Sequence, residues 1–382
     1  MTQDNKKREL IQKEALEEVL KHKRAGLGIS MGVGKTLIGL KYIQHFKNTH
    51  LIPPRVLVVA PKLSIFESWT SDANEFGVDL EGVEFTTYLS LHKQPKKYDI
   101  IILDECHSLL YTHDEYLDGF PGRILGLTGT PPKWHKSEKG EMVNKYCPIK
   151  YKYITDEAVD DKILNDYRIK VHMISLSDRK VIPVQVKGKR WMTSEIDSYA
   201  YWSKRVDLAT TPKSKQIASI MRMKQMMEYP SKERYAARLL GQIKDKCILF
   251  ANTQEQADRL CGHSYHSNNP DSEDNLRAFN EGSILQMSCV LQLNEGINIK
   301  SLKSGIILHA YGNERKASQR IGRLLRLSPE EISTVHILCY EDTVDYKWVT
   351  NALEGFDPTK ILYINNENIS RTSPQRGTAF DI

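Results

Sequence analysis

Short apolar runs alternate with longer amphipathic stretches in the first part of the chain. Leu10, Leu16 and Leu20 share one face of a predicted helix over residues 6–24. A glycine-rich turn is predicted over 26–36, followed by a second helix. Strand patterns then occupy residues 56–60, 100–103 and 124–127. Strands that alternate with helices predict a parallel sheet covered by helices on both faces.

The alternation weakens over about residues 132–165, where KWHKSEKGEMVNKY at 133–146 predicts a solvated loop. A basic, Met-rich helical stretch is predicted over about 194–243. Further strand patterns lie at 169–174, 247–251, 285–291, 305–309 and 334–339. We therefore expect an α/β chain with two tandem domains and a polar tail, with boundaries at 1–160, 161–363 and 364–382.

Composition and charge narrow the class of protein. Hydrophobic residues make up 40% of the 382 positions and charged residues 27%, as in soluble globular chains. The net charge of +6 is compatible with a polyanionic partner. The N-terminal MTQDNKKREL is charged and lacks the apolar core of a secretory signal. We expect a cytoplasmic protein with reduced thiols and no membrane segment, in the host cytoplasm if its source is a virus.

The segment MGVGKT at residues 31–36 predicts a phosphate-binding loop between a strand and a helix. Gly32 and Gly34 let the backbone approach an anion closely, and backbone N–H groups would point at it. Lys35 would meet the β- and γ-phosphates of ATP, and the Thr36 hydroxyl would hold Mg²⁺. Ile29 stands where the full pattern has its first glycine.

An acidic pair follows a buried-strand pattern in YDIIILDECH at residues 98–107. A phosphate loop needs such a pair at the end of a nearby strand. In this interpretation Asp104 is the Mg²⁺ partner, and Glu105 is the general base for the attacking water.

These segments resemble the motifs of the superfamily 2 helicases, with DECH at 104–107 in the DExH style. The other matching segments, in chain order, are VLVVAPKLSIFESW at 56–69, TTYLSL at 86–91, LTGTPP at 127–132, CILFANT at 247–253, LNEGINI at 293–299 and QRIGRLLR at 319–326. The first-half set is most similar to the Swi/Snf-like branch, and the compact size resembles helicases carried by phages. EGINI departs from the GLNL usual in that branch, which puts the branch in doubt.

The resemblance implies two RecA-like lobes with ATP bound between them. Gln12 lies where the family has a glutamine that reads adenine. Arg323 and Arg326 lie three positions apart on a predicted helix, so both can face the γ-phosphate. Gly296 and Asn298 would complete the second wall of the ATP site. His107 and Gln319 would couple the lobes.

The resemblance also implies a nucleic-acid track contacted through its backbone, because a motor must step over any sequence. The candidate contact residues are Lys62, Thr86, Thr87, Asn252 and Thr253. A basic and aromatic cluster suits either a stacking and phosphate-contact surface or core packing, with core packing favoured; it comprises Lys187, Lys189, Arg190, Trp191, Tyr199, Tyr201 and Trp202.

Several functions stay open at this point. The favoured one is a DNA helicase or duplex-DNA translocase that uses ATP and Mg²⁺ in replication, recombination or repair. The alternatives are a DExH-type RNA helicase, a motor subunit of a restriction-type complex, and a non-catalytic nucleic-acid clamp. DNA is favoured over RNA as the partner, and a monomer is compatible with the sequence.

Overall fold

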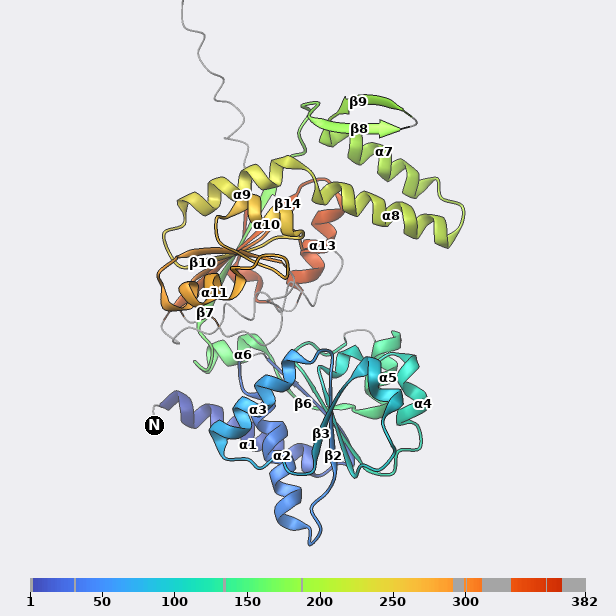
Figure 1. Cartoon of the computed structure of the whole chain (residues 1–382), viewed down its shortest axis with the longest axis vertical. Coiled ribbons are helices and arrows are strands. Elements are labelled where there is room, and N and C mark those ends of the chain that lie inside the picture. Colours follow the sequence, from blue (N-terminus) through green and yellow to red (C-terminus); the bar gives the residue numbers. More distant parts are fainter. Residues whose placement is uncertain are drawn as a thin grey trace, which may run out of the picture. The chain divides into compact units, whose positions relative to one another are not determined.

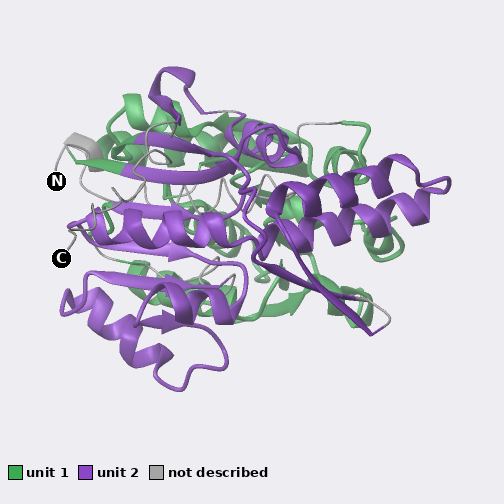
Figure 2. Ribbon diagram, turned by 90° about the horizontal axis from the view of Figure 1, so that it is seen from above, with its two compact units in different colours: residues 1–167, 292–303, 318–333 green, residues 168–291, 304–317, 334–382 purple. Residues whose placement is uncertain are grey.

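The computed structural model describes residues 3–30, 32–132, 135–186, 188–290, 299, 301–310, 331–354 and 356–365. The chain forms two compact units, shown in green and purple in Figure 2. Residues 1–167 make up the main part of unit 1, and residues 168–291 with 334–365 the main part of unit 2. Each unit is built around its own sheet, so the fold is that of two tandem RecA-like α/β domains.

The sheet of unit 1 has six strands in the order β3-β2-β4-β5-β1-β6. Its strands are β1 (Arg24–Ile29), β2 (Val56–Ala60), β3 (Val83–Thr87), β4 (Ile100–Asp104), β5 (Arg123–Thr128) and β6 (Ile149–Tyr153). Every pairing in this sheet is parallel. Strands β2 and β4 are buried throughout, as the continuous apolar runs predict.

Helices cover both faces of this sheet, with α1, α2 and α3 on one side and α4 and α5 on the other (Figure 1). Their bounds, with that of the short α6, are α1 (Gln3–Leu20), α2 (Lys35–Thr49), α3 (Ser64–Phe76), α4 (Asp114–Leu117), α5 (Glu138–Tyr146) and α6 (Thr155–Asp160). This arrangement confirms the expected α/β class.

Strand β1 lies where the sequence predicted a turn. The prediction failed because Gly26 and Gly28 weaken the apolar pattern of RAGLGI. Packing requires both glycines: a Cβ at Gly26 would lie 2.4 Å from the Cys147 carbonyl oxygen, and one at Gly28 would lie 2.9 Å from Pro131. The strand is therefore specified by close neighbours from distant parts of the chain.

The solvated loop predicted over 133–146 is also wrong for most of its length, because α5 lies there. The remainder of the stretch where the pattern weakens contains β6 and α6, and β6 adds an edge strand next to β1. The apolar residues of α5 are few but regularly placed, with Met142, Val143 and Tyr146 all buried. Ser137 begins this helix by accepting a hydrogen bond from the Gly140 backbone N–H at 3.1 Å.

The sheet of unit 2 has seven strands in the order β11-β12-β10-β13-β14-β7-β15. They are β7 (Asp166–Ile174), β10 (Cys247–Phe250), β11 (Ser264–Tyr265), β12 (Gln286–Cys289), β13 (Ser304–Ile307), β14 (Ile332–Tyr340) and β15 (Ile361–Asn365). The helices beside it are α9 (Pro230–Gln242), α10 (Gln254–Leu260), α11 (Ser272–Glu281) and α13 (Val344–Leu353). Five of these strands were predicted from their apolar runs.

An arm interrupts unit 2 between β7 and α9. It consists of an antiparallel hairpin, β8 (Ile182–Val186) and β9 (Lys189–Thr193), followed by two helices that pack against each other, α7 (Glu195–Asp207) and α8 (Pro212–Met227). Figure 1 shows these elements projecting to one side of the unit 2 sheet. Across the described ranges, no helix combines the length and the apolar character needed to cross a membrane.

Candidate active site

The predicted phosphate loop and acidic pair come together at one edge of the unit 1 sheet. Carboxyl ends of parallel strands meet at the same edge, so the loop after β1 and the end of β4 lie on the same side. The register aligns Asp104 with Leu127 and Gly28 with Thr128. Strand β5 therefore lies between the loop and the acids, and it delivers the LTGT segment to the same edge.

The loop after β1 has the geometry that an anion needs. Gly32 and Gly34 both have positive φ angles, of 88° and 104°, which glycine adopts at little cost. Helix α2 begins at Lys35, and no side chain caps its first N–H groups. Within the described ranges, the side chains of Lys35 and Thr36 form no hydrogen bond or ion pair. Free N–H groups, an ammonium and a hydroxyl suit a phosphate group with its metal ion.

Gln12 of α1 lies against this loop. Its side chain is 3% exposed, and its Nε2 donates to the Val33 carbonyl oxygen at 2.8 Å. Its Oε1 accepts from the Lys41 ammonium at 3.3 Å. A Cβ at Gly34 would lie 2.6 Å from the Gln12 Nε2, so the glutamine requires the glycine. Gln12 thus holds the loop backbone from the side of α1.

Asp104 is fixed by three neighbours at the end of β4. The Trp69 indole N–H donates to its Oδ2 at 2.9 Å, and both side chains are buried. The Glu105 backbone N–H donates to its Oδ1 at 2.9 Å. The Tyr88 hydroxyl donates to its backbone carbonyl oxygen at 2.9 Å, and burial raises the Tyr88 pKa well above its usual range. These donors hold the carboxylate in one orientation, as partners of metal ligands commonly do.

Glu105 and His107 form a second network with LTGT. Glu105 has a φ angle of 48°, which is uncommon for a residue with a side chain. Its Oε2 lies 3.2 Å from the His107 Nδ1. The same nitrogen lies 2.7 Å from the Thr128 Oγ1, and the Thr130 backbone N–H donates to that oxygen at 3.0 Å. The acidic motif and LTGT are thereby joined through one imidazole.

The unit 1 candidates for nucleic-acid contact lie along the same edge of the sheet. Lys62 is exposed and follows the end of β2. Thr86 is 5% exposed, and its hydroxyl accepts a hydrogen bond from Gln94 at 3.0 Å. Thr87 ends β3 and is half-buried. Lys62 and Thr87 are therefore the more accessible of the three.

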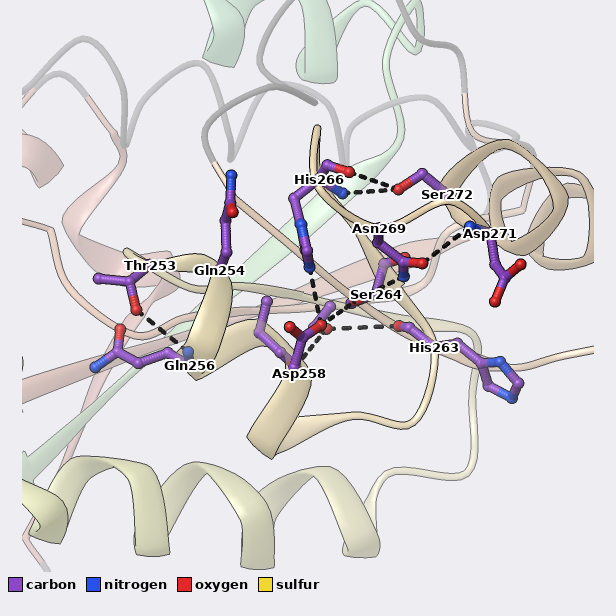
Figure 3. Close-up of polar contacts among 12 residues, drawn as sticks. Thr253, Gln254, Gln256, Asp258, His263, Ser264, His266, Asn269, Asp271 and Ser272 are labelled. Atoms are coloured by element: carbon purple, nitrogen blue, oxygen red, sulfur yellow. Dashed lines mark hydrogen bonds and ion pairs between the residues drawn. The ribbon is translucent and has the colours of Figure 1, made fainter.

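Asn252 and Thr253 follow the end of β10 in unit 2. Thr253 begins α10, where its Oγ1 accepts from the Gln256 backbone N–H at 3.2 Å (Figure 3). The Asn252 side-chain amide is buried and has no hydrogen-bond partner among the described residues. Close by, His266 contacts Asp258 at 2.8 Å, as Figure 3 shows. Thr253 is thus already used as a helix cap, whereas the Asn252 amide is not.

The remaining candidate residues are Gly296, Asn298, Gln319, Arg323 and Arg326. All five lie outside the residues that the structure describes. Their roles rest on the sequence alone.

Sequence reasoning did not single out Trp69 or Tyr88, although both fall inside quoted motifs. Trp69 connects two parts of the site, because it bonds Asp104 and also packs on α2. A Cβ at Gly39 of that helix would lie 2.5 Å from the indole ring. A tryptophan in a helix next to a predicted site is a weak signal, and only the packing reveals its contact with the carboxylate.

Two known protein families match separate parts of the chain. Residues 5–87 match the family described as "Type III restriction enzyme, res subunit". Residues 231–328 match the family described as "Helicase conserved C-terminal domain". The first match includes the phosphate loop, and the second includes QRIGRLLR.

One curated relative matches most of the chain. It is the DNA 3'-5' translocase XPB2 of Sulfurisphaera tokodaii, 25% identical over 371 residues, which cover 88% of this chain and 82% of the relative.

Two solved structures share the fold. One is the ATP-dependent Type ISP restriction-modification enzyme LlaBIII bound to DNA, with a TM-score of 0.62 and 15% identity. That match covers 93% of this chain but only 31% of LlaBIII, so this chain corresponds to about a third of that enzyme. The other is a fragment of an HsdR subunit of a type I restriction enzyme from Vibrio vulnificus YJ016. Its TM-score is 0.57 at 18% identity, over 94% of this chain and 68% of the fragment.

The two family matches and the relative together support a helicase of superfamily 2, an enzyme that hydrolyses ATP. The solved structures add the two-domain fold.

Proposed function

We propose that this chain is a DNA motor that couples ATP hydrolysis to movement along duplex DNA. The observation that carries the proposal is the convergence at one sheet edge of an uncapped phosphate loop with the oriented Asp104 and Glu105. The similarity to a DNA translocase over most of both chains supports DNA as the polymer along which it moves.

In this proposal Lys35 binds the β- and γ-phosphates, and Thr36 and Asp104 hold Mg²⁺. The metal ion would neutralise charge on the phosphates. Trp69 orients Asp104 by its hydrogen bond. Glu105 takes the proton from the attacking water, and the His107 Nδ1 lies 3.2 Å from the Glu105 Oε2. Thr128 and Thr130 tie that imidazole to the end of β5.

The second half of the proposed ATP site comes from the sequence. Arg323 and Arg326 would stabilise charge on the γ-phosphate in the transition state. Gly296, Asn298 and Gln319 would line the same wall. Gln12 would read adenine, and its hold on the Val33 carbonyl suits a residue that senses the loop. Closure of two lobes on ATP, and release after hydrolysis, would tie the chemistry to a motion.

The proposed contacts to the DNA backbone are Lys62 and Thr87 in unit 1 and Asn252 in unit 2. Thr86 and Thr253 would add weaker contacts, because their hydroxyls already accept hydrogen bonds within the protein. The DECH sequence and the first-half motifs resemble the Swi/Snf-like branch, whose members often translocate on duplex without opening it. We therefore favour translocation over strand separation.

The test measures ATPase rate with single-stranded DNA, duplex DNA, forked DNA and RNA, using full-length protein and Mg²⁺. Duplex DNA is expected to stimulate the rate most, and displacement of a third strand from a triplex reports movement. Lys35→Ala protein is the control and should show neither activity. Equal rates with and without every nucleic acid would contradict the proposal, and stimulation by RNA alone would favour an RNA helicase.

A second candidate is the motor subunit of a restriction-type complex, because residues 5–87 match the res subunit family. Such a subunit would need a nuclease partner. Tagged full chain purified from its native source is incubated with circular duplex DNA and ATP. A motor that acts alone should leave the DNA uncut, whereas a chain that copurifies with a nuclease partner should give cut DNA.

A further inference from the structure

The positive charge of the protein is concentrated in the arm of unit 2. Residues 178–227 contain eleven Lys and Arg but only four Asp and Glu, a net charge of +7. The whole chain has a net charge of +6, so the rest of the protein is close to neutral. A local excess of this size is the electrostatic signature of a surface that binds a polyanion.

The basic side chains of the arm are available to a partner. Nine of them are exposed: Arg179, Lys180, Lys189, Arg190, Lys204, Arg205, Lys213, Lys215 and Lys224. No ion pair forms at any of these nine within the described part of the chain. Several basic groups elsewhere are paired, as at Lys145, which contacts Asp114 at 2.9 Å and Asp118 at 3.2 Å.

Aromatic rings lie beside these charges. Tyr201 is 54% exposed and Trp191 is 48% exposed. The core packing that was favoured from the sequence is therefore wrong for these two rings. The Arg205 guanidinium lies 5.8 Å from the Tyr201 ring centre and 5.6 Å from that of Trp202. Exposed rings next to cations suit nucleic acid, whose bases stack and whose phosphates are anionic.

The base of the arm is fixed to unit 2. Glu195 at the start of α7 is fully buried and accepts hydrogen bonds from the backbone N–H groups of Ser177 and Ser231, both at 2.9 Å. The Tyr199 hydroxyl accepts from the Val344 N–H at 2.8 Å. Met226 near the end of α8 is buried in the unit 2 core. These contacts attach α7 and α8 to the core of unit 2, so the exposed basic residues of the arm are held in place on the two helices.

We propose that the arm is a DNA-binding surface distinct from the motif residues, and that it holds the phosphate backbone through its exposed lysines and arginines. This inference rests on the proposed function, because it supplies a second contact to the same track. The arm holds none of the residues proposed to bind ATP, so it sets affinity for DNA rather than the rate of hydrolysis without DNA.

The test compares a variant with Lys204→Gln, Lys213→Gln and Lys215→Gln with one carrying Arg234→Gln, Lys244→Gln and Lys347→Gln. Both variants lose three charges at exposed, unpaired positions of unit 2. Binding of full-length protein to a fluorescent DNA duplex is measured over a range of salt concentrations. The arm variant is expected to bind at least about tenfold more weakly, with a salt slope reduced by about two to three. The control variant should bind nearly as wild type does.

Equal affinities and slopes for the arm and control variants would overturn the proposal and leave the exposed apolar side chains of the arm to a protein partner. ATPase without DNA should be the same in all three proteins. If wild-type protein neither binds DNA nor is stimulated by it, the proposed function itself fails. If wild-type protein is stimulated and the arm variant binds as tightly, only the inference about the arm fails.

Discussion

Hydrogen bonds from neighbouring groups orient the acidic residue at the end of β4. Both carboxylate oxygens of Asp104 accept a hydrogen bond, Oδ2 from Trp69 and Oδ1 from the Glu105 backbone N–H. Glu105 adopts a left-handed backbone conformation, which costs free energy for a residue with a side chain. In the proposed mechanism that turn would give two adjacent carboxylates different tasks, Asp104 as a ligand of Mg²⁺ and Glu105 as the base for water.

Replacement of Glu105 by Gln keeps the shape of the side chain and removes the proposed base. We expect the DNA-stimulated kcat to fall by about 10²–10⁴-fold, because a general base contributes that much. ATP binding should persist, since Lys35 and Asp104 are untouched. Steady-state ATPase and binding of a fluorescent ATP analogue measure the two effects. A variant that hydrolyses ATP at the wild-type rate would show that Glu105 is not the base.

Replacement of Trp69 by Phe removes the N–H that donates to Asp104 while keeping most of the buried ring. We expect about a tenfold or greater loss of Mg²⁺ affinity, because partners of metal ligands commonly contribute 10–100-fold. A Mg²⁺ titration of the ATPase rate measures it. Trp348→Phe in unit 2 is the matched control. An unchanged Mg²⁺ requirement in Trp69→Phe protein would argue against a positioning role.

At the scale of elements, apolar runs predicted strands β2, β4 and β5, because every residue of β2 and β4 and every residue of β5 after Arg123 is buried. Strand β1 escaped prediction because its glycines are selected by the Cys147 carbonyl and by Pro131, which are distant in sequence. The hairpin escaped prediction because β9 is mostly exposed and the described side chains of β8 only alternate between half-buried and exposed. The acidic pair and the phosphate loop were predictable from their order, whereas the Trp69 contact depends on packing.

A pair of buried imidazoles joins the neighbouring strands β7 and β14 of the unit 2 sheet. The His172 Nε2 lies 2.8 Å from the His336 Nδ1, and the Tyr235 hydroxyl lies 2.7 Å from the His172 Nδ1. Burial, with Lys170 nearby, lowers the His172 pKa to about 4. Burial, with His172 and Lys170, lowers the His336 pKa to about 3.

This pair makes the stability of unit 2 depend on pH. The unfolded histidines take up protons below about pH 6.5, but the folded ones do so only near pH 4 and 3. The unfolded state therefore binds more protons across this window, and the free energy of unfolding decreases by a few kcal/mol as pH falls through it. Urea unfolding at several pH values measures the effect. A His172→Gln, His336→Asn variant should show a shallower loss, and parallel curves for the two proteins would contradict this explanation.

At the scale of the whole molecule, the sequence supplies residues for one reaction from both ends of the chain. Lys35 and Glu105 come from the first part, whereas Arg323 and Arg326 come from the last third. The order of the motifs predicted this division, because each motif follows a strand pattern.

Replacement of Arg323 or Arg326 by Ala is expected to lower the DNA-stimulated kcat by about 10³-fold or more for the arginine that contacts the γ-phosphate. ATP affinity should change less, because the phosphate loop is intact. Single-turnover hydrolysis separates the chemical step from binding. Arg277→Ala, on the exposed helix α11, serves as the control. Full activity in both Arg323→Ala and Arg326→Ala proteins would remove these residues from the catalytic proposal.

The place of β5 between β1 and β4 has one more consequence. Two strand spacings amount to about 10 Å, so the cation that follows β1 and the carboxylates that end β4 are held apart. Were the two strands adjacent, Lys35 and Asp104 could neutralise each other by a direct ion pair. Strand β5 keeps these opposite charges apart. A charged ligand can therefore bind at this edge of the sheet without first breaking an internal ion pair.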